Sequence, residues 1–184
     1  MKQQPDRGVA GARVEPEALQ ELLASWPDQP QEAARKTIQR YGPPDEATPS
    51  RLLWFGRGPW KRVVVNRDTI PHRFPKPHND LLEGWIDYRV PPEQVGVLAA
   101  FDGSVRVERT RGELAARCDK EELNYLALNL AHDLVTGKTT VEEARRTYTQ
   151  TAAGFLLGKS DPYTEGLQFQ VPEGGTADPD EPTI

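Results

Sequence analysis

The chain has 184 residues, of which 36% are hydrophobic, and a formal net charge of −5 at neutral pH. This length suits one domain with a real core, because a domain of this size buries roughly 70% of its unfolded surface. A lone cysteine, Cys118, excludes an intrachain disulfide, and no apolar run resembles a signal peptide or approaches the ~20 residues that span a bilayer. These features predict a cytoplasmic protein that does not enter a membrane.

The two ends of the chain differ in composition from its middle. Residues 1–14 are rich in Gly, Gln and charge without periodicity, and the acidic tail at 172–184 is interrupted by Pro and Gly. Such segments bury too little apolar surface to offset the entropy of ordering. We therefore predict a single domain at 15–171 between a disordered N-terminus and a disordered tail.

In the first half of this domain, the spacing of the apolar residues changes once, from that of helices to that of strands. Apolar residues recur at helical spacing after Pro16 and again after Pro30, where the pattern ends at "GPP" (42–44). The β-branched and aromatic runs "RLLWF" (51–55) and "KRVVVNR" (61–67) follow, separated by "GRGP". This pattern predicts two short helices and then a β-hairpin.

The second half contains a strand with strict alternation, "LLEGWIDYRV" (81–90), in which Leu82, Ile86, Tyr88 and Val90 share one face. A short helix at 91–101, a "DG" turn and a strand at 104–110 follow, whereas "GELAARC" (112–118) fits no single assignment. Apolar spacing predicts a helix from 119 to 137, and Thr140 with Glu143 forms a capping box for another that ends at Gly158. Alternation at Leu167, Phe169 and Val171 suggests an edge strand.

These elements predict an α+β fold. We expect a mostly antiparallel sheet of four to five strands, with the N-terminal helices and a C-terminal helical hairpin packed on one face.

The stretch "PHRFPKPHND" (71–80) contains two of the three histidines. A catalytic zinc ion needs three ligands of the His, Asp, Glu or Cys type and one open position, and His72, His78 and Asp80 supply three in nine residues. A histidine general base working with Asp80 is a second hypothesis. Alternatively, the prolines stiffen a connection at the sheet edge and the histidines bond to backbone groups. His132 lies opposite the apolar stripe of its helix, so we expect it not to join this stretch.

A second candidate site is a basic segment. Between Arg51 and Lys76 there are seven basic residues and one acidic residue, so this segment carries +6 and the rest of the chain carries −11. Its cations alternate with aromatic residues, as in surfaces that neutralise phosphates and stack on bases. The residues predicted to bind an acidic protein or single-stranded nucleic acid are Arg57, Trp60, Lys61, Arg62, Arg67, Arg73 and Lys76. Alternatively, the tryptophans belong to the core and the arginines pair with acidic residues such as Glu17, Glu21 and Glu32.

Three weaker signals have structural explanations. "TGKTT" (136–140) lacks the upstream glycine and the preceding strand of a phosphate-binding loop. Arg117 and Lys120 near Cys118 can lower the pKa of a thiol, but we interpret Cys118 as a buried structural cysteine. Glu83, Asp87 and "RTRGE" (109–113) form either a charged pocket or a cross-strand ladder of ion pairs.

Several stretches together resemble a family of small bacterial proteins to which no activity is assigned. These are "YGPPDEAT" (41–48), "GPWKR" (58–62), "PHRFPKPHND", "DGSVRVERTRGELAARCDKEE" (102–122) and "LALNLAHDLVTGK" (126–138). The resemblance covers about residues 30–170. It implies no cofactor and no catalytic residues.

The sequence therefore leaves three functional hypotheses. The first is a non-catalytic binding domain that uses the basic segment. The second is a metal-dependent hydrolase that uses His72, His78 and Asp80 with a divalent metal such as zinc. The third is a small-molecule sensor with a pocket between the sheet and the helical hairpin. The oligomeric state is not predicted by any of these patterns.

Overall fold

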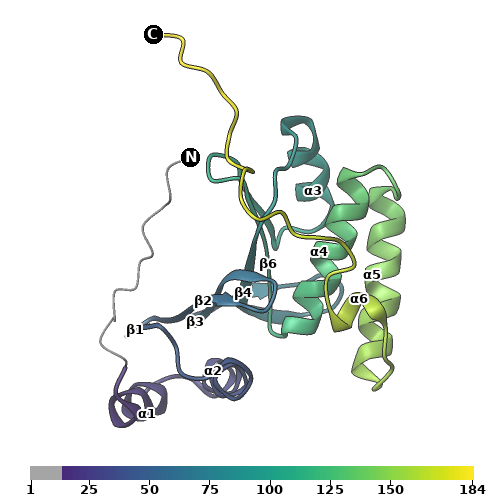
Figure 1. The fold of residues 1–184 in the computed structure, drawn as a ribbon. Helices are drawn as coiled ribbons and strands as arrows, with labels where there is room; N and C mark the ends of the chain where they lie inside the picture. Colours follow the sequence, from purple (N-terminus) through teal and green to yellow (C-terminus); the bar gives the residue numbers. More distant parts are fainter. Residues whose placement is uncertain (1–13) are drawn as a thin grey trace.

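The computed structural model describes residues 14–184. The disorder predicted for residues 1–14 therefore falls, except for Val14, outside the described part of the chain. Two helices, α1 and α2, lie at one end of a sheet, and α4 and α5 lie along another part of it (Figure 1). None of the helices among residues 14–184 is long and apolar enough to cross a membrane.

The sheet has six strands in the order β1-β2-β3-β4-β6-β5, and every neighbouring pair is antiparallel. The prediction of an α+β fold is confirmed, with six strands where four to five were expected, because β1 was not predicted and "GELAARC" was left unassigned. The segment "GELAARC" becomes β6 and lies between β4 and β5. The bounds are β1 (Glu46–Thr48), β2 (Arg51–Arg57), β3 (Trp60–His72), β4 (His78–Asp87), β5 (Val105–Glu108) and β6 (Glu113–Cys118).

Two helix ends lie where the sequence predicts them, the start of α5 and the end of α4. The hydroxyl oxygen of Thr140 accepts a hydrogen bond from the Glu143 backbone N–H at 3.3 Å, which confirms the capping box. The helix before it ends just ahead of Gly137, whose φ of 73° favours glycine. The bounds are α1 (Pro16–Ala24), α2 (Asp28–Tyr41), a 3-10 turn (Pro92–Gln94), α3 (Val95–Phe101), α4 (Glu121–Val135), α5 (Val141–Leu156) and α6 (Pro162–Glu165).

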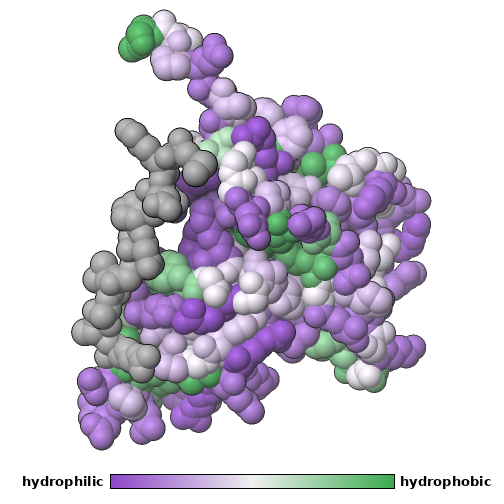
Figure 2. Space-filling view, viewed as in Figure 1, coloured by the Kyte–Doolittle hydropathy of each residue, from purple (hydrophilic) through white to green (hydrophobic). Residues whose placement is uncertain are grey.

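One continuous core lies between the sheet and the helices. It includes Leu23 of α1, Ala34 of α2 and Leu126 of α4, so both groups of helices bury their apolar faces in the same cluster. Ile86 of β4 lies in this core, whereas its neighbour Trp85 belongs to a smaller cluster. This confirms the alternation predicted for β4. The exposed surface is mostly hydrophilic on the face shown in Figure 2.

The strand predicted at residues 167–171 is wrong. The side chain of Asn129 on α4 donates to the carbonyls of Tyr163 and Gly166 and accepts from the backbone N–H of Gln168. These bonds occupy the backbone groups of a loop, so the local alternation does not lead to strand pairing.

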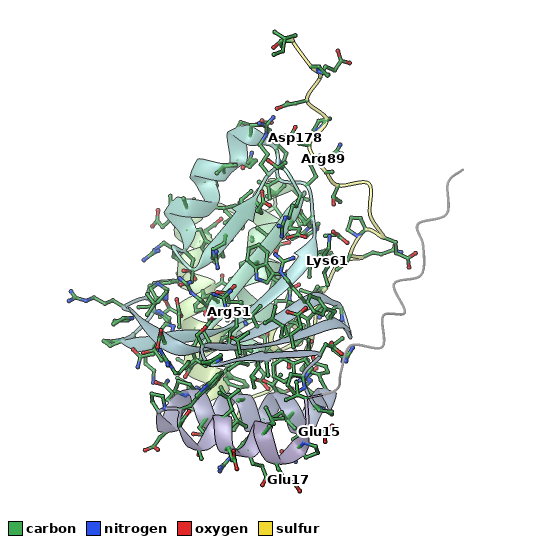
Figure 3. All side chains as sticks on the ribbon, turned by 90° about the vertical axis from the view of Figure 1, so that its left-hand side faces the viewer. Glu15, Glu17, Arg51, Lys61, Arg89 and Asp178 are labelled. Carbon is green, nitrogen blue, oxygen red and sulfur yellow. The ribbon has the colours of Figure 1, made fainter. Side chains whose placement is uncertain are left out.

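The acidic tail also has defined contacts, although its composition predicts disorder. Arg89 donates hydrogen bonds to the carbonyls of Gly175, Thr176 and Ala177, and Arg109 pairs with Asp178. Figure 3 shows Arg89 and Asp178 at the same end of the molecule, beside this segment. The tail therefore runs against the sheet before the chain ends.

Candidate metal centre

The pairing of β3 with β4 brings the two histidines of the opening stretch together. These strands form a hairpin closed by residues 73–77, and its register sets His72 directly opposite His78. Directly opposed residues of an antiparallel pair have neighbouring side chains, and Asp80 follows His78 by two residues on the same face. The imidazole centroids lie 4.9 Å apart. The two rings thus converge instead of splaying apart.

Asp80 lies between the two imidazoles. Its Oδ1 is 3.2 Å from His78 Nε2, and its Oδ2 is 3.6 Å from His72 Nδ1. One ligand atom from each residue lies within 4.8 Å of the other two. Ligand atoms of a tetrahedral zinc ion with bonds near 2.1 Å are separated by ~3.4 Å. The two distances to Asp80 are close to this spacing, and they involve different oxygens, Oδ1 for His78 and Oδ2 for His72.

The far nitrogen of each ring faces an acceptor. His78 Nδ1 lies 2.8 Å from the backbone carbonyl oxygen of Lys76, and His72 Nε2 lies 3.5 Å from Asp102 Oδ1. A proton on each of these nitrogens leaves a lone pair on His78 Nε2 beside Asp80, and one on His72 Nδ1, which lies 3.1 Å from the Ser104 hydroxyl and 3.6 Å from Asp80 Oδ2. Histidines that bind metals are held in this way, with the outer N–H donated to a carbonyl or carboxylate.

The carboxylate of Asp80 is buried, with 1% of the residue exposed. Oδ2 accepts a hydrogen bond from the Ser104 hydroxyl and lies 3.7 Å from Arg117 Nε. Oδ1 forms no hydrogen bond within the described residues, and it lies 3.2 Å from His78 Nε2. A buried carboxylate oxygen without a partner is costly and rare. Oδ1 is therefore the oxygen available for a cation.

The pKa values of His78 and Asp80 describe this cluster in its metal-free, protonated form. Contact with the Asp80 carboxylate, followed by the Cys118 thiol, raises the pKa of His78 to about 11. Burial favours the neutral form of Asp80, but the contacts with His78 and Ser104 outweigh it and hold the pKa of Asp80 below its usual value. Without a metal, a protonated His78 thus pairs with ionised Asp80. A metal ion must displace this proton.

Asp102 and Ser104 were not predicted from the sequence. They flank Gly103 in the turn before β5, where the backbone N–H of Ser104 donates to Asp102 Oδ1 at 2.8 Å. The carbonyl of Ser104 accepts from the N–H of Arg117 on β6, and β6 pairs with β4. Burial raises the pKa of Asp102. The only sequence signal was a "DGS" turn, which predicts a bend but not its neighbours.

A pocket with a volume of about 350 Å³ adjoins this centre, and His78 forms part of its wall. The lining also comes from Gln29 of α2, the turn at 75–77, the residues just before α4 and one side of α5. The side chains of His72 and His78 are 20% and 11% exposed. The centre is thus enclosed but reachable from solvent.

The basic segment does not expose all of the residues that the sequence predicts for a binding surface. Trp60, predicted to bind a partner, is only 1% exposed; its ring stacks on Tyr125 of α4, and its indole N–H donates to Glu121. An added Cβ at Gly84 would lie 2.5 Å from this indole. Trp60 is therefore part of the core and cannot contact a partner.

Most of the cations in this segment have acidic neighbours. Arg57 pairs with Asp45, Lys61 with Asp87 and Glu113, Arg62 with Glu113, and Arg67 with Asp68. These acids differ from the expected Glu17, Glu21 and Glu32. Arg51 and Lys61 lie well apart on the sheet in Figure 3, so the cations of this segment are not gathered in one place. Arg73 and Lys76 are exposed in the hairpin turn, and neither forms an ion pair with a described residue.

The remaining candidates have structural roles. Cys118 is buried, and burial raises the pKa of its thiol. Glu83 on β4 lies 3.8 Å from Arg117, the residue opposite it on β6, and 3.0 Å from Arg106 on β5, as expected for ion pairs across the sheet. His132 bonds to the Tyr88 hydroxyl at 2.9 Å and stacks on Phe169, and it contributes nothing to the cluster of His72, His78 and Asp80.

Comparison of the chain with protein-family models, with curated proteins and with solved structures gave no match.

Proposed function

We propose that this protein binds a divalent transition-metal ion, such as zinc, between His72, His78 and Asp80. The observation that carries the proposal is the buried Asp80 Oδ1, which has no hydrogen-bond partner and lies beside two imidazoles whose outer nitrogens face acceptors. Imidazole and carboxylate are ligands that zinc accepts, and three of them are typical of a catalytic site.

Three protein ligands leave a fourth tetrahedral position, where zinc binds water and lowers its pKa to about 7. The chain's own groups hold the ligands for this role. Asp102 and the Lys76 carbonyl fix the ring orientations, and Ser104 occupies Asp80 Oδ2 so that Oδ1 stays available. The adjoining pocket admits a small substrate. We therefore propose hydrolysis as the chemistry of the site.

The test is the metal content of the full chain, measured by native mass spectrometry and elemental analysis after equilibration with zinc. We expect about one ion per chain in the wild type, and none in His78→Ala or Asp80→Asn. Loss of a ligand should lower the affinity by more than the 10–100-fold typical of outer-shell changes. His132→Ala is the matched control, because it removes the histidine outside the cluster. Wild-type protein without bound zinc, or zinc retained by His78→Ala, would overturn the proposal.

Binding of an acidic partner by the basic segment is a second candidate function. Arg73 and Lys76 favour it, since both are exposed and form no ion pair within residues 14–184. The pairing of Arg57, Lys61, Arg62 and Arg67 with local acids weakens it. A salt-dependent affinity for single-stranded DNA that falls when Arg73 and Lys76 become alanine would support it.

A further inference from the structure

The pocket beside His78 has two chemically different walls. One wall comes from the hairpin turn and the residues just before α4, and it includes Lys76, His78, Asp119 and Lys120. A second part of the lining comes from α5 and includes Thr149, Ala152, Ala153 and Leu156, with Leu123 of α4 adding to the apolar part. A ligand that fits both walls has one polar end and one apolar end.

The polar wall favours an anion. Two lysines and one carboxylate, Asp119, line it; Asp119 pairs with Lys120 and accepts a hydrogen bond from the Cys118 thiol, so Lys76 is the lysine that keeps an uncompensated charge within residues 14–184. Lys76 is exposed and forms no ion pair with any described residue, so its charge is available to a ligand. A pocket of about 350 Å³ lies near the lower end of the roughly 300–1,000 Å³ range of small-molecule sites. The ligand is therefore small.

We infer that this pocket binds a small amphipathic anion, with its carboxylate or phosphate group beside Lys76 and Lys120 and its short apolar chain against α5. The inference rests on the proposed function in one respect: this anion is the substrate class of the metal site, because His78 belongs to both the site and the pocket wall. Binding of the anion itself requires only the pocket.

The experiment is isothermal titration calorimetry of the full chain with hexanoate, hexyl phosphate and hexylamine. We expect both anions to bind and the amine, which has the same chain and the opposite charge, not to bind. The substitution Lys76→Met keeps the aliphatic stem and should weaken anion binding at least tenfold. Lys138→Met is the control, since Lys138 lies beyond the other end of α4 and pairs with Asp133. Ala153→Leu fills the apolar wall at an exposed position and should weaken binding without loss of fold.

Each titration is run on zinc-loaded protein and on protein treated with a chelator. Anion binding without any zinc uptake would refute the proposed metal site and leave the pocket assignment standing. Zinc uptake without anion binding, or equal binding of hexanoate and hexylamine, would overturn this inference alone. Preference for hexyl phosphate over hexanoate, or the reverse, identifies the group that the lysines select.

Discussion

Each end of strand β3 contains residues that the sequence predicts to be functional. In the structure, the side chains at the two ends have opposite environments. At the start of the strand, Trp60 is buried and Lys61 and Arg62 have acidic partners. At the end, His72 approaches a buried carboxylate, Asp80, one of whose oxygens has no hydrogen-bond partner. Polar groups that bond to each other indicate a structural role. A buried polar group without a hydrogen-bond partner indicates a binding site.

The largest effect that tests this comparison is at the start of β3. Trp60→Ala removes a buried ring that packs over Gly84 and stacks on Tyr125. We expect the free energy of unfolding in urea to fall by about 3–5 kcal/mol, the range for truncation of a buried aromatic residue. Protein that remains folded should still bind zinc. A loss below 1 kcal/mol would show that Trp60 is not in the core.

The second prediction concerns the stability that a metal ion bound at the His72 end of β3 adds to the protein. A ligand present at 100 times its dissociation constant stabilises the folded state by about 2.7 kcal/mol, which corresponds to a Tm increase of about 5–11 °C for a chain of this length. We expect this shift for the wild type with zinc in a thermal melt, and no shift for Asp80→Asn. An equal shift in both proteins would place the zinc elsewhere.

The pH dependence follows from the raised pKa of His78, about 11 in the metal-free protein. Zinc binding displaces this proton, so the affinity should rise by up to about tenfold per pH unit between pH 7 and 9. The stability of the metal-free protein should change with pH in the opposite direction. A raised histidine pKa stabilises the folded state fully below the unfolded value near 6.5, and this contribution is lost as the pH rises towards 11. Zinc titrations and chelated melts at several pH values should therefore show opposite trends. Parallel trends would contradict the assignment.

The smallest effect is expected for the paired cations. Changing Arg57, Lys61, Arg62 and Arg67 together to alanine should alter the affinity for single-stranded DNA less than twofold at low salt, because local carboxylates already neutralise them. Fluorescence anisotropy measures this. A loss of tenfold or more would support the binding surface predicted from the sequence.

What the sequence predicts well is local. The alternation in β4, the β2-β3 hairpin and the Thr140 capping box each depend on residues a few positions apart, and all three are confirmed. The trio of His72, His78 and Asp80 was also visible, because a nine-residue hairpin brings its own ends together. Its geometry required the register of β3 against β4, which no pattern within the stretch specifies.

The missing parts are non-local. Asp102 and Ser104 reach the centre only because β6 pairs with β4 and carries the turn before β5 with it, and "GELAARC" could not be assigned to a strand in advance. The acid partners of the basic segment include Glu113, 51 residues from Arg62 in sequence. Charge counted along the chain therefore overstated the positive potential of a surface that long-range pairing neutralises.

The most direct test of the metal centre is a crystal structure of the full chain with zinc, with data collected on both sides of the zinc absorption edge. The account predicts one anomalous peak within about 2.0–2.2 Å of His72 Nδ1, His78 Nε2 and Asp80 Oδ1, with a fourth non-protein ligand. No peak between these atoms, with Asp80 paired only to the protonated His78, would contradict it.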